Sequence, residues 1–210
     1  IVSQASLTNP GMKSYYTEND IVPLSDIQEV PETAELSFKQ SKASFDQEIE
    51  LEKEFAYTAG FFIAEGSQRR KQLNFVNKNT DFLEKVKKYF KKFEVGFYEK
   101  KDKNGCHYLT ISSSFFSKVF KALGLADKRI GDELLDMPEG CLEKLYQGLI
   151  DGDAAIREDR VEYYTSDKEL ASDISYLCSM LGKVCSISYR ERKDGRDEYR
   201  LEIKEEPFKL

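Results

Sequence analysis

One short pattern occurs twice in the chain, as Thr58-Ala59-Gly60-Phe61-Phe62-Ile63-Ala64-Glu65-Gly66 and as Tyr146-Gln147-Gly148-Leu149-Ile150-Asp151-Gly152-Asp153-Ala154. Each copy has two small residues four positions apart and then an acid. On a helix this spacing puts both small residues on one face, where bare backbone lets a second helix come close. One copy is typical of ordinary core packing, but two copies that start 88 residues apart indicate a duplication. We therefore expect one helix–helix interface made of Gly60, Ala64, Gly148 and Gly152.

The acid that closes each copy carries the expected chemistry. Two equivalent helices related by a pseudo-twofold axis would bring Glu65 and Asp153 together at one end of the pair. That end is the C-terminal end of both helices, where the helix dipole is already negative. Two carboxylates there repel each other unless divalent cations lie between them. We therefore expect Glu65 and Asp153 to be metal ligands.

The two copies resemble the signature helices of LAGLIDADG homing endonucleases, a type that is also found inside inteins. Gly148-Leu149-Ile150-Asp151-Gly152-Asp153 follows the family pattern closely, whereas the first copy has Ile63 for the first acid and Glu65 for the second. The resemblance covers roughly residues 51–210. It implies an α+β fold: a pseudo-twofold pair of αββαββα repeats, each with a curved antiparallel sheet, which together form a saddle over duplex DNA.

The resemblance also implies an activity, a site-specific double-strand DNA endonuclease that hydrolyses phosphodiester bonds. Mg²⁺ would be the cofactor, with Ca²⁺ or Mn²⁺ as substitutes. Glu65 and Asp153 would be catalytic ligands, and the carbonyls of Ala64 and Gly152 would add to them, since Mg²⁺ keeps several waters and needs few protein ligands. The family places a basic residue near the scissile phosphate, and Lys128 matches that place in the first repeat. A surface lysine in a link is the alternative, and the equivalent in the second repeat would lie beyond Leu210.

Composition and charge set limits on these expectations. The net charge of −6 argues against tight non-specific nucleic-acid binding, but its distribution is uneven: residues 1–54 carry −7, residues 55–125 carry +8 and residues 126–210 carry −7. The first repeat can therefore still present a cationic surface. No apolar run is long enough to cross a membrane, and no signal peptide is visible. Four cysteines without a CxxC pair and the single His107 argue against a zinc or histidine-rich site and predict reduced thiols in the cytoplasm.

We divide the chain into an N-terminal extension or connector (1–50), a first repeat (51–140) and a second repeat (141–210) that is incomplete at its C-terminal end. In the first repeat we predict a helix that opens with a capping box at residues 44–47 and ends at Glu65. A strand pair in 67–79, a helix from 79 or 80 to 93, a hairpin of 95–98 and 108–111 and a helix from 113 or 114 to 123 follow. In the second repeat we predict a strand at 160–165, a helix at 167–181 and a hairpin of 184–191 and 199–203.

Polar side chains on the predicted strands are the candidates for DNA contacts. Because alternate strand residues share a face, one face of each sheet would offer groups that bond to phosphates and base edges. An ordinary solvent-facing surface is an equally good interpretation for any single one of them. The candidates are Gln68, Arg70, Gln72, Asn74, Asn77, Tyr98, Lys100, Tyr163, Thr165, Tyr189, Arg190, Arg192 and Arg200.

Two classes of function fit these features. The first is a metal-dependent endonuclease, the homing domain of an intein, acting as a monomer with internal pseudo-symmetry on double-stranded DNA and flanked by a splicing domain. The start at Ile1 rather than Met suggests a piece of a longer polypeptide. The second is a catalytically inactive relative that binds DNA, or RNA as a splicing module. The two acids favour the enzyme, whereas Ile63, the missing second lysine and the acidic pI of about 5.1 favour the inactive relative.

Overall fold

The computed structural model describes residues 14–16, 21–23, 35–39, 46–191 and 197–204. The first half of its core consists of α2 (Lys53–Glu65), β5 (Gly66–Arg69), β6 (Gln72–Asn77), α3 (Thr80–Lys91), β7 (Phe97–Lys101), β8 (His107–Ser112) and α4 (Ser114–Ala122). The link contains η2 (Leu125–Asp127) and α5 (Asp132–Leu135). The second half consists of α6 (Glu139–Asp153), β9 (Ala154–Ile156), β10 (Val161–Thr165), α7 (Lys168–Met180), β11 (Val184–Glu191) and β12 (Asp197–Lys204).

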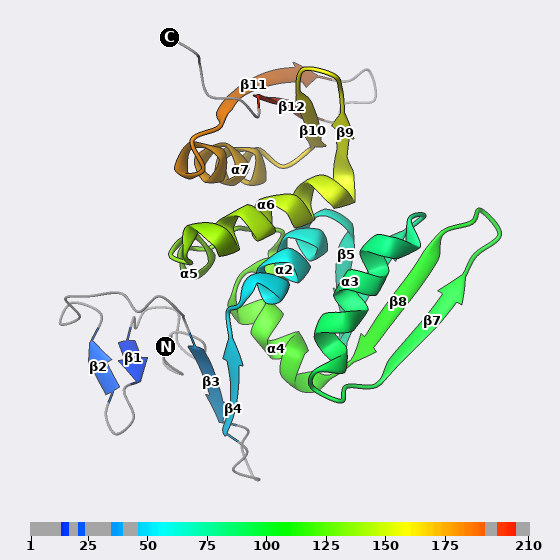
Figure 1. The fold of residues 1–210 in the computed structure, drawn as a ribbon, viewed down its shortest axis with the longest axis vertical. Helices are drawn as coiled ribbons and strands as arrows, with labels where there is room; N and C mark the ends of the chain where they lie inside the picture. The colour runs from blue at the N-terminus through cyan, green and yellow to red at the C-terminus, as the bar shows by residue number, and fades with distance from the viewer. Residues whose placement is uncertain (1–13, 17–20, 24–34, 40–45, 192–196, 205–210) are drawn as a thin grey trace.

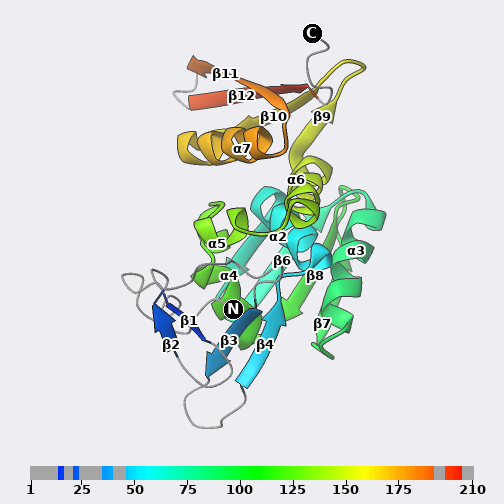
Figure 2. The same cartoon turned by 60° about the vertical axis from the view of Figure 1, so that its left-hand side comes forward.

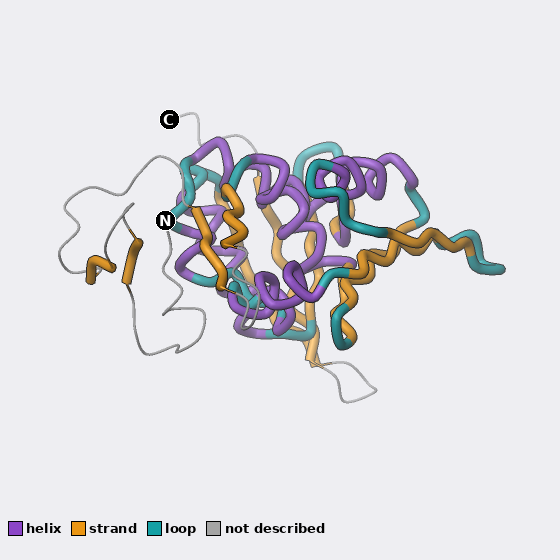
Figure 3. Tube along the Cα trace, turned by 90° about the horizontal axis from the view of Figure 1, so that it is seen from below, coloured by secondary structure: helices purple, strands orange, loops and turns teal. Residues whose placement is uncertain are grey.

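Both halves have the same sheet topology. Their antiparallel sheets have the strand orders β5-β6-β8-β7 and β9-β10-β12-β11, so equivalent strands hold equivalent places. Figure 1 shows α7 against the upper sheet and α3 and α4 beside the lower one, with α2 and α6 between them. The β7–β8 hairpin projects from the body of the molecule, to the right in Figures 1 and 3. The α+β fold with two antiparallel sheets is confirmed.

Helix α2 lies at the centre of the molecule. It runs beside α6, as Figures 1 and 2 both show, and every residue from Phe55 to Ile63 is buried. A helix that is apolar around its whole circumference requires partners on all sides. The first sheet and α4 supply some of these partners through Phe75 and Phe120, whose rings lie 5.4 and 4.9 Å from that of Phe62.

The contact between α2 and α6 is reciprocal. A Cβ added to Gly60 would lie 2.0 Å from the carbonyl oxygen of Leu145, and a Cβ added to Gly148 would lie 2.2 Å from that of Tyr57. Residues 57 and 145 are related by the same 88-position offset as residues 60 and 148. Each helix therefore offers the same surface to the other, as in a twofold-symmetric interface. The helices approach so closely only because both positions are glycine.

The predicted start of the first motif helix is wrong. Residues 46–50, part of the expected capping box and helix, form β4 (Asp46–Glu50), which pairs with β3 (Glu35–Lys39), and the helix begins at Lys53. Residues 44 and 45 lie outside the described residues. A local pattern could not reveal β3, because the strand partner lies upstream in the chain. The N-terminal segment also contains the pair β1 (Ser14–Tyr16) and β2 (Ile21–Pro23).

The other predicted elements occur within a few residues of their expected bounds, and β9 is an additional strand. It has only three residues, too few for a periodicity to predict. The four cysteines lie within the described residues and form no disulfide. In the described part of the chain, no helix combines the length and apolar character that crossing a bilayer requires.

Candidate functional site

Each motif helix passes directly into the first strand of its own sheet. α2 ends at Glu65 and β5 begins at Gly66, while α6 ends at Asp153 and β9 begins at Ala154. Each acid thus lies at the junction of the central helix pair and a sheet. This placement follows from the sequence, because the acid closes the helical pattern in both copies.

The two junctions are neighbours in space. A Cβ added to Gly152 would lie 2.4 Å from the Cβ of Ala64 and 3.3 Å from the Cγ of Glu65. Burial raises the pKa of the half-buried Glu65, and the charge of Asp153 raises it further. Asp153 keeps an exposed surface, yet the protein atoms around it also raise the pKa of its carboxyl. The structure therefore places the two acids side by side, at a cost in free energy for their charged forms.

Lys128 reaches the same place from the link between the halves. Its ammonium donates to the carbonyl oxygen of Phe62 at 2.7 Å and to that of Gly66, at the C-terminal end of α2. Burial lowers the pKa of Lys128 to about 8, although the charges of Glu65 and Asp153 raise it. The Lys128 backbone is left-handed, with a φ of 58°, a conformation that is common at functional sites.

Two residues that we predicted to contact DNA lie at the acids instead. Asn77 donates from Nδ2 to Oε1 of Glu65 at 3.4 Å. Tyr163 is 1% exposed, and burial together with the charges of Asp153 and Glu65 raises its pKa. Its strand partner is Leu201, on the face that packs against the helices, so the prediction that Tyr163 faces a groove is wrong. The positions of Asn77 and Tyr163 relative to Leu73 and Val161 could have shown which face each residue occupies.

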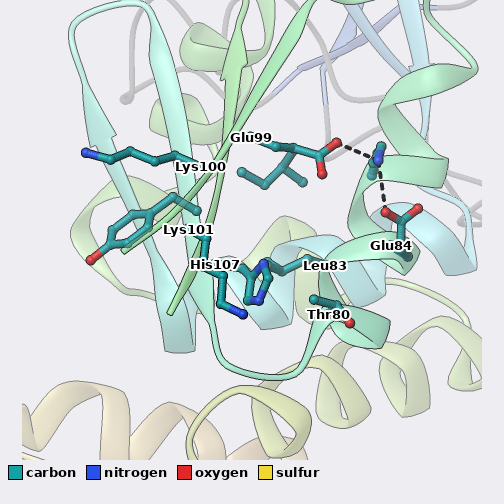
Figure 4. Close-up of a pocket in the computed structure, with 10 residues that line it drawn as sticks. Thr80, Leu83, Glu84, Glu99, Lys100, Lys101 and His107 are labelled. Carbon is teal, nitrogen blue, oxygen red and sulfur yellow. Dashed lines mark hydrogen bonds and ion pairs between the residues drawn. The ribbon is translucent and has the colours of Figure 1, made fainter. Parts of the chain in front are cut away.

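The first sheet has one apolar and one polar face. The apolar face, with Leu73, Phe75, Leu109 and Ile111, is buried under the helices. Figure 4 shows the alternation on β7: Glu99 points toward α3 and the neighbouring Lys100 points away. By strand register, the polar residues of the first polar face are Ser67, Arg69, Gln72, Asn74, Tyr98, Lys100, Tyr108, Thr110 and Ser112, and Val76 lies among them.

Four of the seven contacts predicted in the first repeat therefore lie on the first polar face, whereas Gln68 and Arg70, like Asn77, do not. Gln72, Asn74, Tyr98 and Lys100 belong to it, and Thr110 donates to Oδ1 of Asn74 at 2.8 Å. Gln68 was assigned to the wrong face: it pairs with Leu73, and its Nε2 donates to the carbonyl oxygen of Ser117 at 2.9 Å. Arg70 lies in the exposed β5–β6 turn, with a φ of 54°.

The second sheet is divided in the same way. By register, the polar and charged residues of the second polar face are Arg157, Arg160, Glu162, Tyr164, Ser186, Ser188, Arg190, Glu198, Arg200, Glu202 and Lys204. Arg190 and Arg200 lie on it, as we predicted. Thr165 and Tyr189 do not: Thr165 accepts from the Asp167 N–H at the start of α7, and the Tyr189 ring lies 5.4 Å from the ring of Tyr199, tilted by 46°. Arg192 lies outside the described residues.

The first acid of the second copy has a structural role that the sequence did not reveal. One oxygen of Asp151 accepts from the Tyr57 hydroxyl and from Lys85, both at 2.9 Å, and the other accepts from Gln147 at 2.7 Å. The pair related by the 88-residue offset is Leu145 and Ile63, both buried. In the second copy the acid Asp151 faces a tyrosine, Tyr57. In the first copy the equivalent position is Ile63, and the counterpart of the tyrosine is Leu145, which has no hydroxyl to bond to an acid.

A pocket of about 170 Å³ lies between α3 and the β7–β8 hairpin (Figure 4). Lys87 bonds there to Glu84 at 2.9 Å and to Glu99 at 2.5 Å. None of the residues that line it is Glu65, Lys128 or Asp153. Within the described residues, no group of three or more His, Cys, Asp and Glu side chains could hold a metal ion. A cation at the two acids would therefore depend on backbone carbonyls and water for its other ligands.

Comparisons with known proteins agree with this geometry. A family model described as a LAGLIDADG-like domain matches residues 52–124 and 143–209. The chain is 29% identical over 148 residues to a subunit of the A-type ATP synthase of Methanopyrus kandleri and 26% identical over 141 residues to the Rpo1C subunit of the DNA-directed RNA polymerase of Methanocaldococcus jannaschii. These matches cover 69% and 64% of this chain but only 14% and 16% of those proteins.

Solved structures share the fold at low sequence identity. I-DmoI in complex with DNA and Mn matches with a TM-score of 0.57 and 14% identity, over 73% of this chain and 90% of that one. The N-terminal LAGLIDADG domain of DUF199/WhiA matches with a TM-score of 0.52 and 13% identity, over 75% and 78% of the two chains. Another I-DmoI structure is a complex with DNA and Ca, and a variant of I-DmoI was solved with its target DNA in the presence of Mg.

Proposed function

The chain belongs to the LAGLIDADG-like domain family, and on that premise we propose that it is a site-specific, metal-dependent endonuclease for double-stranded DNA, acting as a monomer with internal pseudo-symmetry. The observation that carries this proposal is the position of Glu65 and Asp153, side by side at the ends of two reciprocal helices. Each of the two acids is followed directly by the first strand of a sheet that has one polar face. Two acids, one from each repeat, match a substrate with two strands to cut.

The first polar face would supply much of the attraction to DNA. It carries Arg69 and Lys100 among amides, hydroxyls and phenols, and none of the outward residues assigned to it is acidic. Such groups bond to phosphates and base edges. Because phosphate contacts release counterions, DNA binding should weaken steeply as salt rises.

The acids fit a hard divalent cation. Both carboxylates have raised pKa values because burial disfavours their charged forms, and a bound cation would offset that cost. Oxygen ligands of this kind suit Mg²⁺ and Ca²⁺. Glu65 and Asp153 would hold the ion with the carbonyls of Ala64 and Gly152. When bound, such an ion neutralises charge at a scissile phosphate and lowers the pKa of a coordinated water. The I-DmoI structures with Mn, Ca and Mg support this choice.

The chain's own groups prepare the rest of the site. Asn77 bonds to Glu65 and limits the directions that its carboxylate can take. The carbonyls of Phe62 and Gly66 hold the Lys128 ammonium beside both acids. With a pKa of about 8, Lys128 can release a proton near neutral pH, which suits a group that protonates the leaving oxygen or stabilises charge on the phosphate.

The two curated relatives support an intein context. Subunits of an ATP synthase and of an RNA polymerase both match this chain, each through a small fraction of its length. A mobile insertion is expected to occur as a similar segment inside otherwise unrelated proteins, such as these two subunits. We therefore propose that this domain is of the intein type, with a splicing domain beside it in an intracellular host protein.

A second candidate is a DNA-binding or RNA-binding module without cleavage, favoured by Ile63 and by a second polar face on which arginines are paired with acids. The deciding experiment selects a target from a randomised duplex pool and then assays its cleavage with Mg²⁺. Glu65→Gln and Asp153→Asn should keep binding and lose cleavage of at least one strand. Asp136→Asn, the same change at an exposed position outside the site, is the control. Specific binding by the unaltered chain without Mg²⁺-dependent cleavage would establish the second candidate.

A further inference from the structure

A buried carboxylate lies in the middle of the second polar face. The Glu162 side chain is 4% exposed on a sheet face whose neighbouring residues are open to solvent. Its Oε1 accepts from Arg160 Nε at 3.0 Å and from Arg200 Nη2 at 2.6 Å. Its Oε2 accepts from Arg157 Nε at 3.3 Å and from the Tyr164 hydroxyl at 3.1 Å. All four acceptor sites of the carboxylate are therefore used.

These contacts keep Glu162 ionised and fix the arginines. Burial raises the pKa of Glu162, but the bonds from Arg160, Arg200, Tyr164 and Arg157 together hold it at about 2. A guanidinium with one N–H bonded to a buried anion loses much of its rotational freedom. Such a pair is a means of orienting an arginine, because its planar group has five N–H donors in fixed directions.

The network is also close to electrically neutral. Arg160 also pairs with Asp159, and Arg200 also pairs with Glu202. Together with Glu162 itself, these acids balance the charges of Arg157, Arg160 and Arg200. The network around Glu162 therefore has little net charge with which to attract phosphates. An arginine that serves only phosphate binding gains nothing from a buried carboxylate at its side, whereas one that must present donors in a fixed direction does.

Arg157 is the arginine best placed to meet a ligand. Its side chain is 56% exposed, against 32% for Arg160 and 34% for Arg200. Only its Nε bonds to Glu162, and among the described residues no hydrogen bond uses either terminal nitrogen. Two parallel N–H donors at the end of a guanidinium match O6 and N7 of guanine in the major groove.

We propose that the second polar face reads a guanine in the major groove of the target duplex through Arg157, with Glu162 as its positioning residue. The proposal rests on the DNA-binding function proposed above. It assigns different tasks to the two sheets: the first holds the duplex through its cationic and amide groups, and the second discriminates between bases.

The test is a binding selection from a randomised duplex pool, sequenced for the unaltered chain and for three variants. Arg157→Gln replaces the guanine-reading fork by an amide that favours adenine. Glu162→Gln keeps the shape of the positioning residue and removes its charge. Arg190→Gln is the matched control, because it makes the same substitution on the same face at a residue outside the set of four donors that bond to Glu162. Thermal melting of every variant reports whether it folds.

The unaltered chain should select a site with a guanine at one position. Arg157→Gln should lose a preference of roughly 10-fold to 100-fold at that position, or change it to adenine. Glu162→Gln should weaken the same preference, bind random duplex more tightly and have a salt dependence steeper by about one unit of slope. Arg190→Gln should lower affinity without altering the selected sequence.

Two results would overturn the proposal. A selected site that is identical for the unaltered chain and for the folded Arg157→Gln variant would make the network purely structural, and so would a site without guanine. If Mg²⁺-dependent cleavage of the selected site persists in either case, the proposed endonuclease stands and only the guanine assignment fails. If the unaltered chain selects no sequence at all, both the guanine assignment and the proposed site-specific endonuclease are refuted.

Discussion

Replacing Gly148 by alanine should destabilise the protein, although alanine is the better helix former. The new Cβ would lie 2.2 Å from the carbonyl oxygen of Tyr57 and 2.7 Å from the amide nitrogen of Phe61. Both are backbone atoms, so no side-chain rotation relieves the overlap. The helices must separate until these distances exceed about 3.0 Å, which loosens packing along the whole interface.

The magnitude follows from two opposing effects. Overpacking that requires a backbone shift costs about 3 kcal/mol at the upper end of its usual range. Alanine recovers about 1 kcal/mol over glycine within a helix. We therefore expect the free energy of unfolding to fall by about 2 kcal/mol and the melting temperature by about 4–8 °C for a chain of this size. Gly60→Ala should behave alike, because its Cβ would lie 2.0 Å from the carbonyl oxygen of Leu145.

Urea unfolding and thermal melting measure the effect, with Gly140→Ala as the control in the same helix. A Cβ at Gly140 would meet only the end of the Lys53 side chain, at 3.0 Å from Cε, and that side chain can move. This control should unfold at the same urea concentration as the unaltered chain or at a higher one. If Gly148→Ala matched it, the reciprocal backbone contact between α2 and α6 would be refuted.

Three further predictions concern single side chains. Tyr57→Phe removes the hydroxyl that donates to Asp151 and should cost about 1.5–3 kcal/mol in urea unfolding, whereas Tyr176→Phe at an exposed position should cost nothing measurable. Since Glu162 has a pKa of about 2 in the folded chain against 4.5 ordinarily, the free energy of unfolding should rise with pH across that interval, and unfolding curves of Glu162→Gln should lack that part of the rise. Ca²⁺ at 100 times its Kd should stabilise the folded chain by about 2.7 kcal/mol and so raise its melting temperature. An equal rise in the Glu65→Gln variant would show that the ion binds elsewhere.

The sequence could predict the helix pair because its signal is local and occurs twice. Gly60 and Gly148 are four residues from a second small residue, and an acid follows each pair, so spacing alone placed Glu65 and Asp153 at one end of the interface. The hairpins were predictable from alternation and turn residues. The start of α2 was not, because β4 pairs with a strand from the N-terminal segment.

The face that each strand residue occupies was harder to predict. Tyr163 and Gln68 are polar enough to suggest a solvent face, but the register pairs them with Leu201 and Leu73. Tyrosine buries its ring readily, and Gln68 satisfies its amide on a carbonyl of α4. We predicted the face of these residues from their polar side chains. In the structure, the face is set by the place of each residue in the alternation along its strand.

The uneven charge of the chain agrees with the division of tasks that we propose for its two halves. A net charge of −6 would oppose DNA binding if it were spread evenly, but residues 55–125 carry +8 and build the first polar face. Acids in the second half, such as Glu162 and Glu202, are bonded to arginines and reduce its attraction for phosphates. If phosphate contacts hold the duplex mainly to the first half, contacts with bases in the second half determine which DNA sequences bind tightly. Selectivity in such a protein should therefore respond most to substitutions in the half that contributes least to affinity.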